Sequence, residues 1–279
     1  MLSQIRQDKK LLFGLLGFGS GAIGALIAEI IPMDRQSTFF TALIDVVLWA
    51  AIAGMLIAIG LFWAIEVYSR RQTDWALLLK KSVPSGLAAG ALSGGIAQIV
   101  FSLTEFPDIM TQVIFQAACW GIMGCFLGFS LSYSIRNLGT KKAIVAGIVG
   151  GFIGGLGFLI TSDLLVATFG RMIGIGILGA ALGLCLIIVE ERYREAYLEV
   201  HWAKNESSTF TLGGVPIHIG GSNEDDVFVY GIQPRAMTLW MEKGRVKGTY
   251  HVTGESKELR DGNPIKLGKV EMVVRMKSI

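Results

Sequence analysis

Residues 141–161 read KKAIVAGIVGGFIGGLGFLIT, a pair of lysines followed by an apolar run without a charged residue. An α-helix rises about 1.5 Å per residue and a bilayer core is about 30 Å thick, so about 20 apolar residues can cross it. In lipid the backbone N–H and C=O groups must find partners within the protein, and a helix pairs them within one segment. This stretch therefore predicts a transmembrane helix.

Five other runs of similar length and composition surround this one. Hydrophobic residues make up 52% of the 279 residues and charged residues 17%, which is typical of a chain with a large membrane part. The six predicted spans are 11–31, 42–65, 86–103, 113–134, 143–161 and 172–189. We therefore expect a polytopic α-helical membrane domain over residues 1–190, followed by a soluble tail.

The six spans form three tandem glycine-rich hairpin repeats, over about 9–79, 80–140 and 141–190. A Lys-Lys pair precedes the first helix of each repeat, and small residues recur along both helices at steps of three or four. Such steps place the small residues on one helix face, where two backbones can approach closely in lipid. The predicted helix-packing residues are Gly17, Gly21, Gly24, Ala51, Gly54, Ala58, Gly86, Gly90, Gly94, Gly121, Gly124, Gly128, Gly147, Gly151, Gly155, Gly176, Gly179 and Gly183.

Two interpretations of these faces stay open. The small residues form a packing seam within the chain or between copies in a homo-oligomer, or the three hairpins surround a pseudo-threefold axis that forms a pore or substrate cavity. A pathway normally exposes polar or ionisable groups to the interior. The candidates for such groups are Glu29, Asp45, Gln98, Gln116 and Arg171, and all but Gln98 lie near the predicted outer ends of their helices.

Basic residues are distributed unevenly between the two ends of the predicted helices. The segments before the first, third and fifth helices and after the sixth hold twelve Lys or Arg residues, whereas the other connections hold only Arg35 and Arg171. By the positive-inside rule, both termini are expected in the cytoplasm, and we expect a multi-pass protein of the plasma (inner) membrane. Glu66 and Glu191 lie eight residues after the last small residue of their helices, and Arg136 takes that place in the second repeat.

The tail changes character after the last helix. Residues 191–206 are predicted to be a helical extension and a linker, and residues 207–279 a small cytoplasmic β-domain. Short apolar runs separated by Gly, Pro, Asn and Asp predict strands and turns. The predicted strand segments are FTLGG, VPIHIGG, DVFVYG, MTLWMEKG, TYHVTG, PIKLG and VEMVVRM. About 70–80 residues of this kind are typical of an all-β sandwich or barrel.

Two segments of the tail resemble the forkhead-associated (FHA) domain family. Residues 219–227, IGGSNEDDV, stand in the place of the family's I-G-R-S-x-x-x-D-I, and residues 259–268, LRDGNPIKLG, are similar to its L-x-D-G-D-x-I-x-L-G. The resemblance covers less than a third of the chain. It implies a β-sandwich that reads phosphothreonine peptides through its loops.

The sequence departs from this family at the phosphate-binding positions. Gly221 replaces the arginine of I-G-R-S, and residues 232–237, IQPRAM, lack the serine and histidine of the S-R-x-x-H element. A hydrogen bond to a charged group contributes about 1.5–3 kcal/mol, so the loss of two contacts weakens phosphate binding strongly. Three alternatives follow: phosphothreonine binding, recognition of an unmodified partner, or packing against the membrane domain. The residues that would form the partner or phosphopeptide site are Gly221, Ser222, Asn223, Gln233 and Arg235.

Other kinds of chemistry find little support in the sequence. No metal-ligand spacing, phosphate-binding loop or catalytic motif emerges, so we expect no metal, no cofactor and no enzymatic activity. The net charge of +3 is too small to indicate a nucleic-acid partner. Basic turns around Lys243 and Arg245 favour contact with anionic membrane lipid.

These observations lead to two hypotheses of function. The first is a membrane-anchored scaffold or adaptor whose cytoplasmic FHA-like domain recruits a protein partner, with or without phosphorylation. The alternative is a channel or transporter with a pathway through the three-repeat core, in which the β-domain is a regulatory module.

Overall fold

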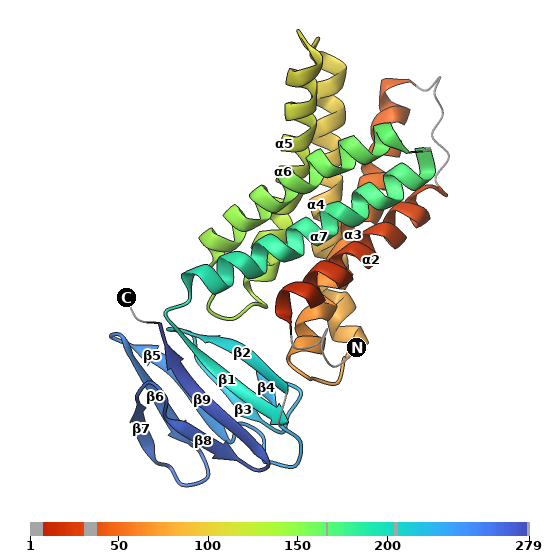
Figure 1. Ribbon diagram of the computed structural model, residues 1–279. Helices are drawn as coiled ribbons and strands as arrows, with labels where there is room; N and C mark the ends of the chain where they lie inside the picture. Colours follow the sequence, from red (N-terminus) through yellow and green to blue (C-terminus); the bar gives the residue numbers. More distant parts are fainter. Residues whose placement is uncertain (1–7, 31–37, 166, 204–205, 278–279) are drawn as a thin grey trace.

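The computed structural model describes residues 8–30, 38–165, 167–203 and 206–277. A bundle of long helices stands on a smaller β-domain, and the chain passes from the helices to the β-domain once (Figure 1). Residue 31 of the first predicted span, Arg6 and Arg35 of the charge comparison, and residues 204–205 of the predicted linker lie outside the described residues.

Within the described ranges, six helices are long and apolar enough to cross a membrane, and they match the six predicted spans. The helices are α2 (Lys9–Ala28), α3 (Phe39–Tyr68), α4 (Trp75–Leu103), α5 (Ile109–Ser132), α6 (Thr140–Leu164) and α7 (Ala167–Tyr193). Asp8, Thr38, Asp74 and Asp108 cap four of the N-termini, because each side chain accepts a hydrogen bond from the backbone N–H three residues later. The predicted fold class, a six-helix part followed by a β-domain, is confirmed.

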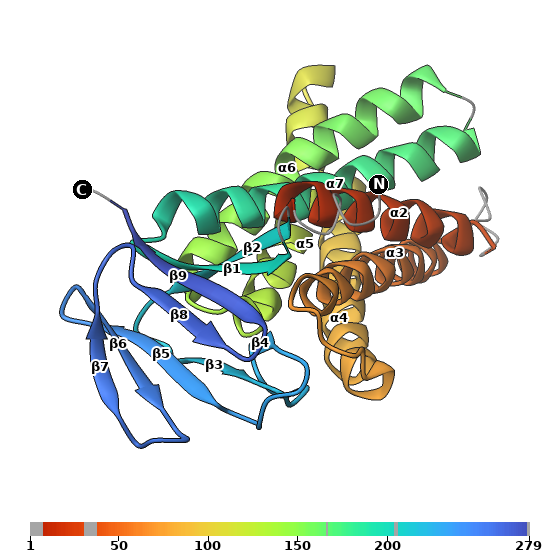
Figure 2. The ribbon, with the colours of Figure 1, turned by 60° about the horizontal axis from the view of Figure 1, so that its bottom comes forward.

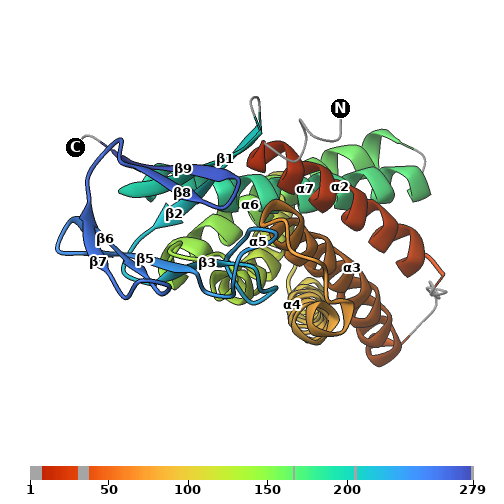
Figure 3. The same cartoon turned by 90° about the horizontal axis from the view of Figure 1, so that it is seen from below.

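The helices form a ring in which each helix contacts the next in the sequence. Contacts between α2 and α7 close the ring, and both helices lie side by side in Figures 2 and 3. The second helices of the repeats, α3, α5 and α7, supply most of the large side chains of the interior, such as Ile57, Met123, Leu127 and Leu182. The middle of the ring is therefore filled with apolar side chains.

The small residues lie mainly at three equivalent helix contacts: α2 with α7, α3 with α4, and α5 with α6. A Cβ at Gly17 would collide with the backbone of Gly179, and one at Gly183 would lie 2.7 Å from the carbonyl oxygen of Phe13. The α3–α4 contact brings Gly54 and Ala58 against Gly86 and Gly90, and the α5–α6 contact brings Gly124 and Gly128 against Gly147 and Ala143. Each seam thus joins the second helix of one repeat to the first helix of the next, with the third repeat joined to the first.

The β-domain consists of two sheets that face one another as two layers (Figure 2). One sheet has the order β2-β1-β9-β8 and the other β4-β3-β5-β6-β7, and all described strand pairs except β3–β4 are antiparallel. The strands are β1 (Ala196–Ala203), β2 (Glu206–Leu212), β3 (Ile217–Gly220), β4 (Val227–Phe228), β5 (Met237–Glu242), β6 (Arg245–Tyr250), β7 (Ser256–Leu259), β8 (Pro264–Leu267) and β9 (Val270–Met276). Leu198, Ile219, Leu239 and Met272 are among the fully buried residues of its core.

The segment 191–206 differs from its predicted role as a helical extension and linker. The helix ends at Tyr193, and residues 196–203 form β1, which pairs with both β2 and β9 in the middle of a sheet. Ala196, Leu198 and Val200 are buried, whereas the residues between them are half-buried. This period of two is the pattern of a strand, but the charged residues beside it resemble a solvated helix end. Strand β7 matches no predicted segment, since three of its four residues are exposed, and the predicted segment TYHVTG (249–254) overlaps β6 only at residues 249–250.

Candidate functional site

The loops that the sequence singled out come together at one end of the β-domain. The loop between β3 and β4 begins at Gly221, whose N–H donates a hydrogen bond to the carbonyl oxygen of Gln233 (3.0 Å). Asp225 is fully buried, and its Oδ2 accepts hydrogen bonds from the backbone N–H groups of Ser222 (2.9 Å) and Arg235 (3.2 Å). One buried carboxylate thus joins the two loops that hold the predicted site residues.

Gly221 stands where the resemblance implies a phosphate-binding arginine, and the backbone leaves no space for a side chain there. A Cβ on Gly221 would collide with the carbonyl oxygen of Ile232. A Cβ on the preceding Gly220 would collide with the backbone nitrogen of Arg235. The two loops approach each other so closely that an arginine at position 221 requires a shift of the backbone.

The same loop is bound to the helical part through Asp226. Its Oδ1 accepts hydrogen bonds from Arg136 Nε (2.8 Å) and Arg71 Nη2 (3.3 Å), and its Oδ2 accepts one from the backbone N–H of His218 (2.9 Å). Arg71 Nε also donates to the carbonyl oxygen of Asp225 (2.8 Å). The side chain of Asp226 is 6% exposed, so this carboxylate is held between the helices and strand β3.

Asn223 extends this contact to the connection between α3 and α4. Its side-chain oxygen accepts a hydrogen bond from the backbone N–H of Gln72 (3.3 Å). Of the five predicted partner-binding residues, Asn223 is therefore engaged by the chain's own helical part. Beside it, a cavity of about 550 Å³ is lined by Ser222, Asn223 and Glu224 from the loop and by Arg71 and Lys81 from the helical part.

A second group of contacts fixes the β-domain to the ends of α2, α3 and α7. Glu190 is 4% exposed, accepts a hydrogen bond from Lys9 Nζ (2.7 Å), and accepts another from the Thr211 hydroxyl on β2 (2.9 Å). The Tyr68 hydroxyl accepts a hydrogen bond from the N–H of Thr209 (2.7 Å). A buried charge is stabilised only when it is paired and hydrogen-bonded, and Glu190 meets both conditions.

Contacts from other connections complete this junction. Arg70 forms an ion pair with Glu206, and its guanidinium lies 4.4 Å from the centre of the Trp202 ring. Asn137, between α5 and α6, donates to the Thr211 carbonyl (3.0 Å) and accepts from the Val215 N–H (2.9 Å). The β-domain is therefore docked on several helix ends at once.

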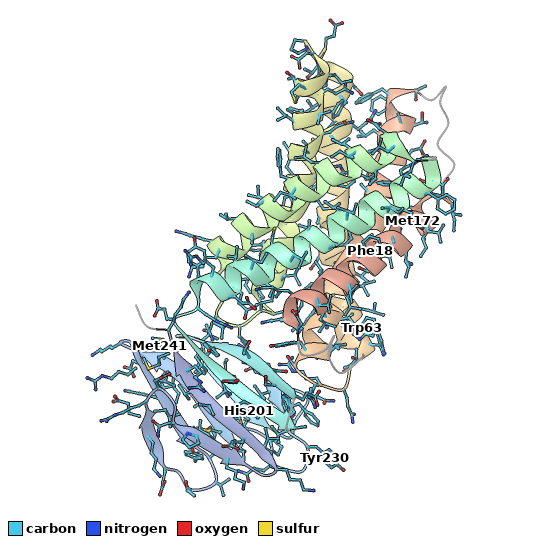
Figure 4. All side chains as sticks on the ribbon, in the orientation of Figure 1. Phe18, Trp63, Met172, His201, Tyr230 and Met241 are labelled. Carbon is cyan, nitrogen blue, oxygen red and sulfur yellow. The ribbon has the colours of Figure 1, made fainter. Side chains whose placement is uncertain are left out.

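Part of the predicted site remains open to solvent. Arg235 has a left-handed backbone (φ 47°), its side chain is 63% exposed, and its Nη2 lies 4.0 Å from Glu224 Oε2. Gln233 is exposed as well, and Tyr230 is 90% exposed and projects from the β-domain (Figure 4). Ser222 is half-buried, and its hydroxyl oxygen accepts a hydrogen bond from the N–H of Glu224 (3.2 Å). We refer to Tyr230, Gln233 and Arg235 as the exposed loop surface.

Four of the polar candidates for a membrane pathway lie at two separate places on the helical part. Arg171 and Glu29 form an ion pair (3.0 Å) between the ends of α7 and α2 that lie away from the β-domain. Gln98 and Gln116 line a cavity of about 240 Å³ near Trp49 and Trp120, and residues of α3, α4, α5 and α6 contribute to its lining. These groups lie in separate places on the helical part.

Comparisons with known proteins give limited similarity. No protein-family model and no curated protein matches this chain. Among solved structures, one from a structural and functional analysis of phosphothreonine-dependent FHA domain interactions is 18% identical, with a TM-score of 0.26, and the match covers 30% of this chain and 98% of that chain. Mycobacterium tuberculosis EmbR in complex with a low affinity phosphopeptide is 10% identical, also with a TM-score of 0.26, and the match covers 97% of this chain and 72% of that chain.

Neither similarity assigns this chain to a family, because both TM-scores are far below 0.5. The arrangement of the β-domain as two facing sheets follows from its own strand pairing and agrees with the β-sandwich that the sequence resemblance implied.

Proposed function

We propose that the protein is a membrane-anchored adaptor without catalytic activity, whose β-domain recruits a protein partner. The observation that carries this proposal is the position of Asp226, buried between Arg71, Arg136 and strand β3. This contact and the Glu190 group hold the β-domain against the helix ends, while the exposed loop surface faces solvent. A rigid, membrane-bound module with an open surface is suited to recruitment.

The charge distribution supports a cytoplasmic position for the β-domain. The helix ends that contact it bear Lys9, Arg70, Arg71 and Arg136, and the Lys-Lys pairs of the repeats belong to the same ends. Positively charged connections are retained on the cytoplasmic side of a membrane. We therefore propose both termini in the cytoplasm and a location in the plasma (inner) membrane.

The chemistry of the loops favours an unmodified partner over a phosphothreonine peptide. Gly221 has no space for an arginine, and Arg235 lies beside Glu224, which opposes a phosphate. Tyrosine and arginine are enriched among the residues that contribute most to binding in protein interfaces, and Tyr230 and Arg235 are both exposed. The exposed loop surface is therefore suited to a peptide or protein whose binding does not depend on a phosphate.

The test is binding of the full-length protein in lipid nanodiscs to matched arrays of phosphothreonine and unphosphorylated peptides at physiological salt. We expect bound sequences to be captured equally well, or better, without the phosphate. Tyr230→Ala with Arg235→Ala should weaken binding by at least 1 kcal/mol, or about fivefold, as loss of interface hot spots does. Arg245→Ala is the control, because this exposed arginine lies at the other end of strands β5 and β6, and the variant should bind normally.

Two results would contradict this proposal. Capture of phosphothreonine peptides alone would show a phosphorylation-dependent adaptor, with Arg235 as the first candidate for the phosphate contact. Equal loss of binding in the Arg245→Ala control would show that the exposed loop surface is not the recognition site.

A further inference from the structure

A cavity of about 460 Å³ lies where α2, α7 and the β-domain meet. Four of its lining side chains are basic: Lys10 from α2, Arg192 from α7, Arg194 from the α7–β1 junction and Lys277 from the segment after β9. Glu191 is the acidic residue of this lining. Figure 1 shows why distant parts of the sequence contribute, since β9 ends next to the point where α7 passes into β1. The formal charge of the lining is strongly positive.

Contacts with neighbouring groups hold these cations in place. Lys10 Nζ lies 2.6 Å from Glu191 Oε2, so the acidic residue offsets one of the four positive charges. Lys277 Nζ donates a hydrogen bond to the carbonyl oxygen of Arg192 (3.1 Å), and the Lys277 N–H donates one to the carbonyl oxygen of Glu195 (2.8 Å). The last described residue of the chain is thus tied to the end of α7, which brings its ammonium group to the cavity.

Arg194 is fixed from the side of the β-domain. Its guanidinium lies 4.2 Å from the centre of the Tyr197 ring, and Nη1 donates to the Thr209 hydroxyl (3.3 Å). Arg194 also lines a second cavity, of about 280 Å³, together with Lys142 and Lys243. Glu195 is the acidic residue of this second lining, so three basic residues against one acidic residue extend the positive formal charge toward α6.

The apolar neighbours of this cavity place it at the level of lipid headgroups. Leu11 follows Lys10 on α2 and is 44% exposed, and Ile188 precedes Arg192 by one turn on α7 and is 50% exposed. Both side chains lie on helices that are long and apolar enough to span a membrane, near the ends next to the β-domain. A molecule with an anionic group and a hydrocarbon part matches both features. Its anionic group fits the basic cavity, and its hydrocarbon covers Leu11 and Ile188.

We propose that this cavity binds the phosphate group of an anionic phospholipid, with its acyl chains along Leu11 and Ile188. Basic pockets beside transmembrane helices attract anionic headgroups, and each Lys or Arg near the surface adds to the attraction. Free phosphate presents the same oxygen atoms, but it lacks the hydrocarbon that would cover the two apolar side chains. The lipid would contact α2, α7 and the β-domain together.

The test uses the purified full-length protein in neutral detergent, titrated with phosphatidylglycerol or phosphatidylcholine of identical acyl chains. Native mass spectrometry counts the lipids bound per protein, which makes the result independent of membrane orientation. We expect preferential binding of phosphatidylglycerol. The double variant Arg192→Gln/Lys277→Gln removes two positive charges and should weaken this binding about tenfold.

The matched control is Lys266→Gln/Lys269→Gln, which removes the same charge from the exposed end of the β8–β9 hairpin that points away from the helices (Figure 1). It should bind phosphatidylglycerol like the unaltered protein. Inorganic phosphate is titrated separately, at the same concentrations as the lipid. We expect that it neither binds to the protein alone nor displaces bound phosphatidylglycerol. Melting curves of both double variants show whether they are folded.

Three outcomes would overturn the proposal. Equal binding of the two lipids by the unaltered protein would do so without reference to any variant. An equal loss of binding in the control would show that net charge alone attracts the lipid. Displacement of the lipid by inorganic phosphate at the same concentration would identify a site for free phosphate.

Discussion

Asp226 receives hydrogen bonds from two arginines of the helical part and from strand β3 of its own domain. Arg136 is 90 positions before Asp226 in the sequence, and Arg71 is 155 positions before it. Ion pairs across such separations cannot be read from local patterns. The charge pattern did contain one signal. Arg136 lies eight residues after the last small residue of its helix, the position that Glu66 and Glu191 take in the other repeats. Those glutamates pair with Arg71 and Lys10, whereas Arg136 pairs with Asp226.

Replacement of Asp226 by asparagine tests this contact. Asp226→Asn keeps an oxygen acceptor but removes the charge that Arg71 and Arg136 share, and Arg71 then keeps its ion pair with Glu66. We expect a loss of about 1–3 kcal/mol in the stability of the docked state. Limited proteolysis in nanodiscs should show faster cleavage after Arg71. Glu258→Gln, at an exposed ion pair with Arg245, should change stability by no more than about 0.5 kcal/mol; an equal effect of both variants would contradict this role of Asp226.

Gly221 is the position at which the sequence departs from the arginine that the resemblance implies. The predicted loop residues do meet at one end of the β-domain, as the resemblance suggested. The buried carboxylate of Asp225 brings them together, and it also draws the loops so close that an arginine is excluded. The sequence alone shows that the arginine is missing. The backbone adds that the carbonyl oxygen of Ile232 leaves no space for a side chain at this position.

Restoring the arginine should therefore fail to create a phosphate site. Gly221→Arg forces the loop away from the Ile232 carbonyl and should cost about 1–3 kcal/mol of stability, as overpacking does. Gly214→Arg is the matched control, because a Cβ on Gly214 meets nothing within 4 Å. Thermal melting and phosphothreonine-peptide binding measure both effects. A stable Gly221→Arg variant with new phosphopeptide affinity would show that the loop accommodates the family's arginine.

At the scale of elements, the glycine faces explain how three hairpins close into a ring. The steps of three and four along each helix were visible in the sequence, and so was the repeat. The partner of each face was not visible, because identical spacing suits contact within a hairpin, between hairpins or between copies of the chain. The structure pairs helices of successive repeats, with Gly17 against Gly179, Gly90 against Ala50, and Gly147 against Gly124.

Two neighbouring glycines of α2 provide a direct test of this pairing. Gly17→Ala places a methyl group against the backbone of α7 and should destabilise the bundle by about 1–3 kcal/mol. Gly19→Ala places the same group in open space and should be neutral or should stabilise the helix by up to about 1 kcal/mol. Thermal unfolding in detergent measures both. Equal melting temperatures for the two variants would contradict the α2–α7 seam.

Strand β1 shows where reading elements from the sequence fails. Its buried residues alternate correctly, but Arg192, Arg194 and Glu195 directly before it continue the charged character of the end of α7. A short alternating run beside a long helix is ambiguous without its partners. Pairing with β2 and β9 determines that this segment is a strand and not a helix, and both partners lie later in the chain.

For the whole molecule, the filled ring argues against an aqueous pathway through its middle. Ile57, Met123 and Leu182 are fully buried in one apolar cluster. We expect proteoliposomes to release small ions and solutes no faster than protein-free vesicles. A flux assay with fluorescent indicators measures this rate, with a known channel as the positive control. Protein-dependent flux would favour the channel or transporter hypothesis.

Both the exposed loop surface and the lipid cavity depend on docking of the β-domain on the helix ends. Cysteine cross-linking in native membranes measures this docking. The pair Gln72→Cys and Asn223→Cys replaces residues whose atoms are hydrogen-bonded across the junction. The control pair, Gln72→Cys with Lys257→Cys, uses an exposed residue of the edge strand β7. We predict rapid disulfide formation in the first pair and little in the second. Equal cross-linking of both pairs, or none in either, would show that the β-domain is not held at the base of the helices.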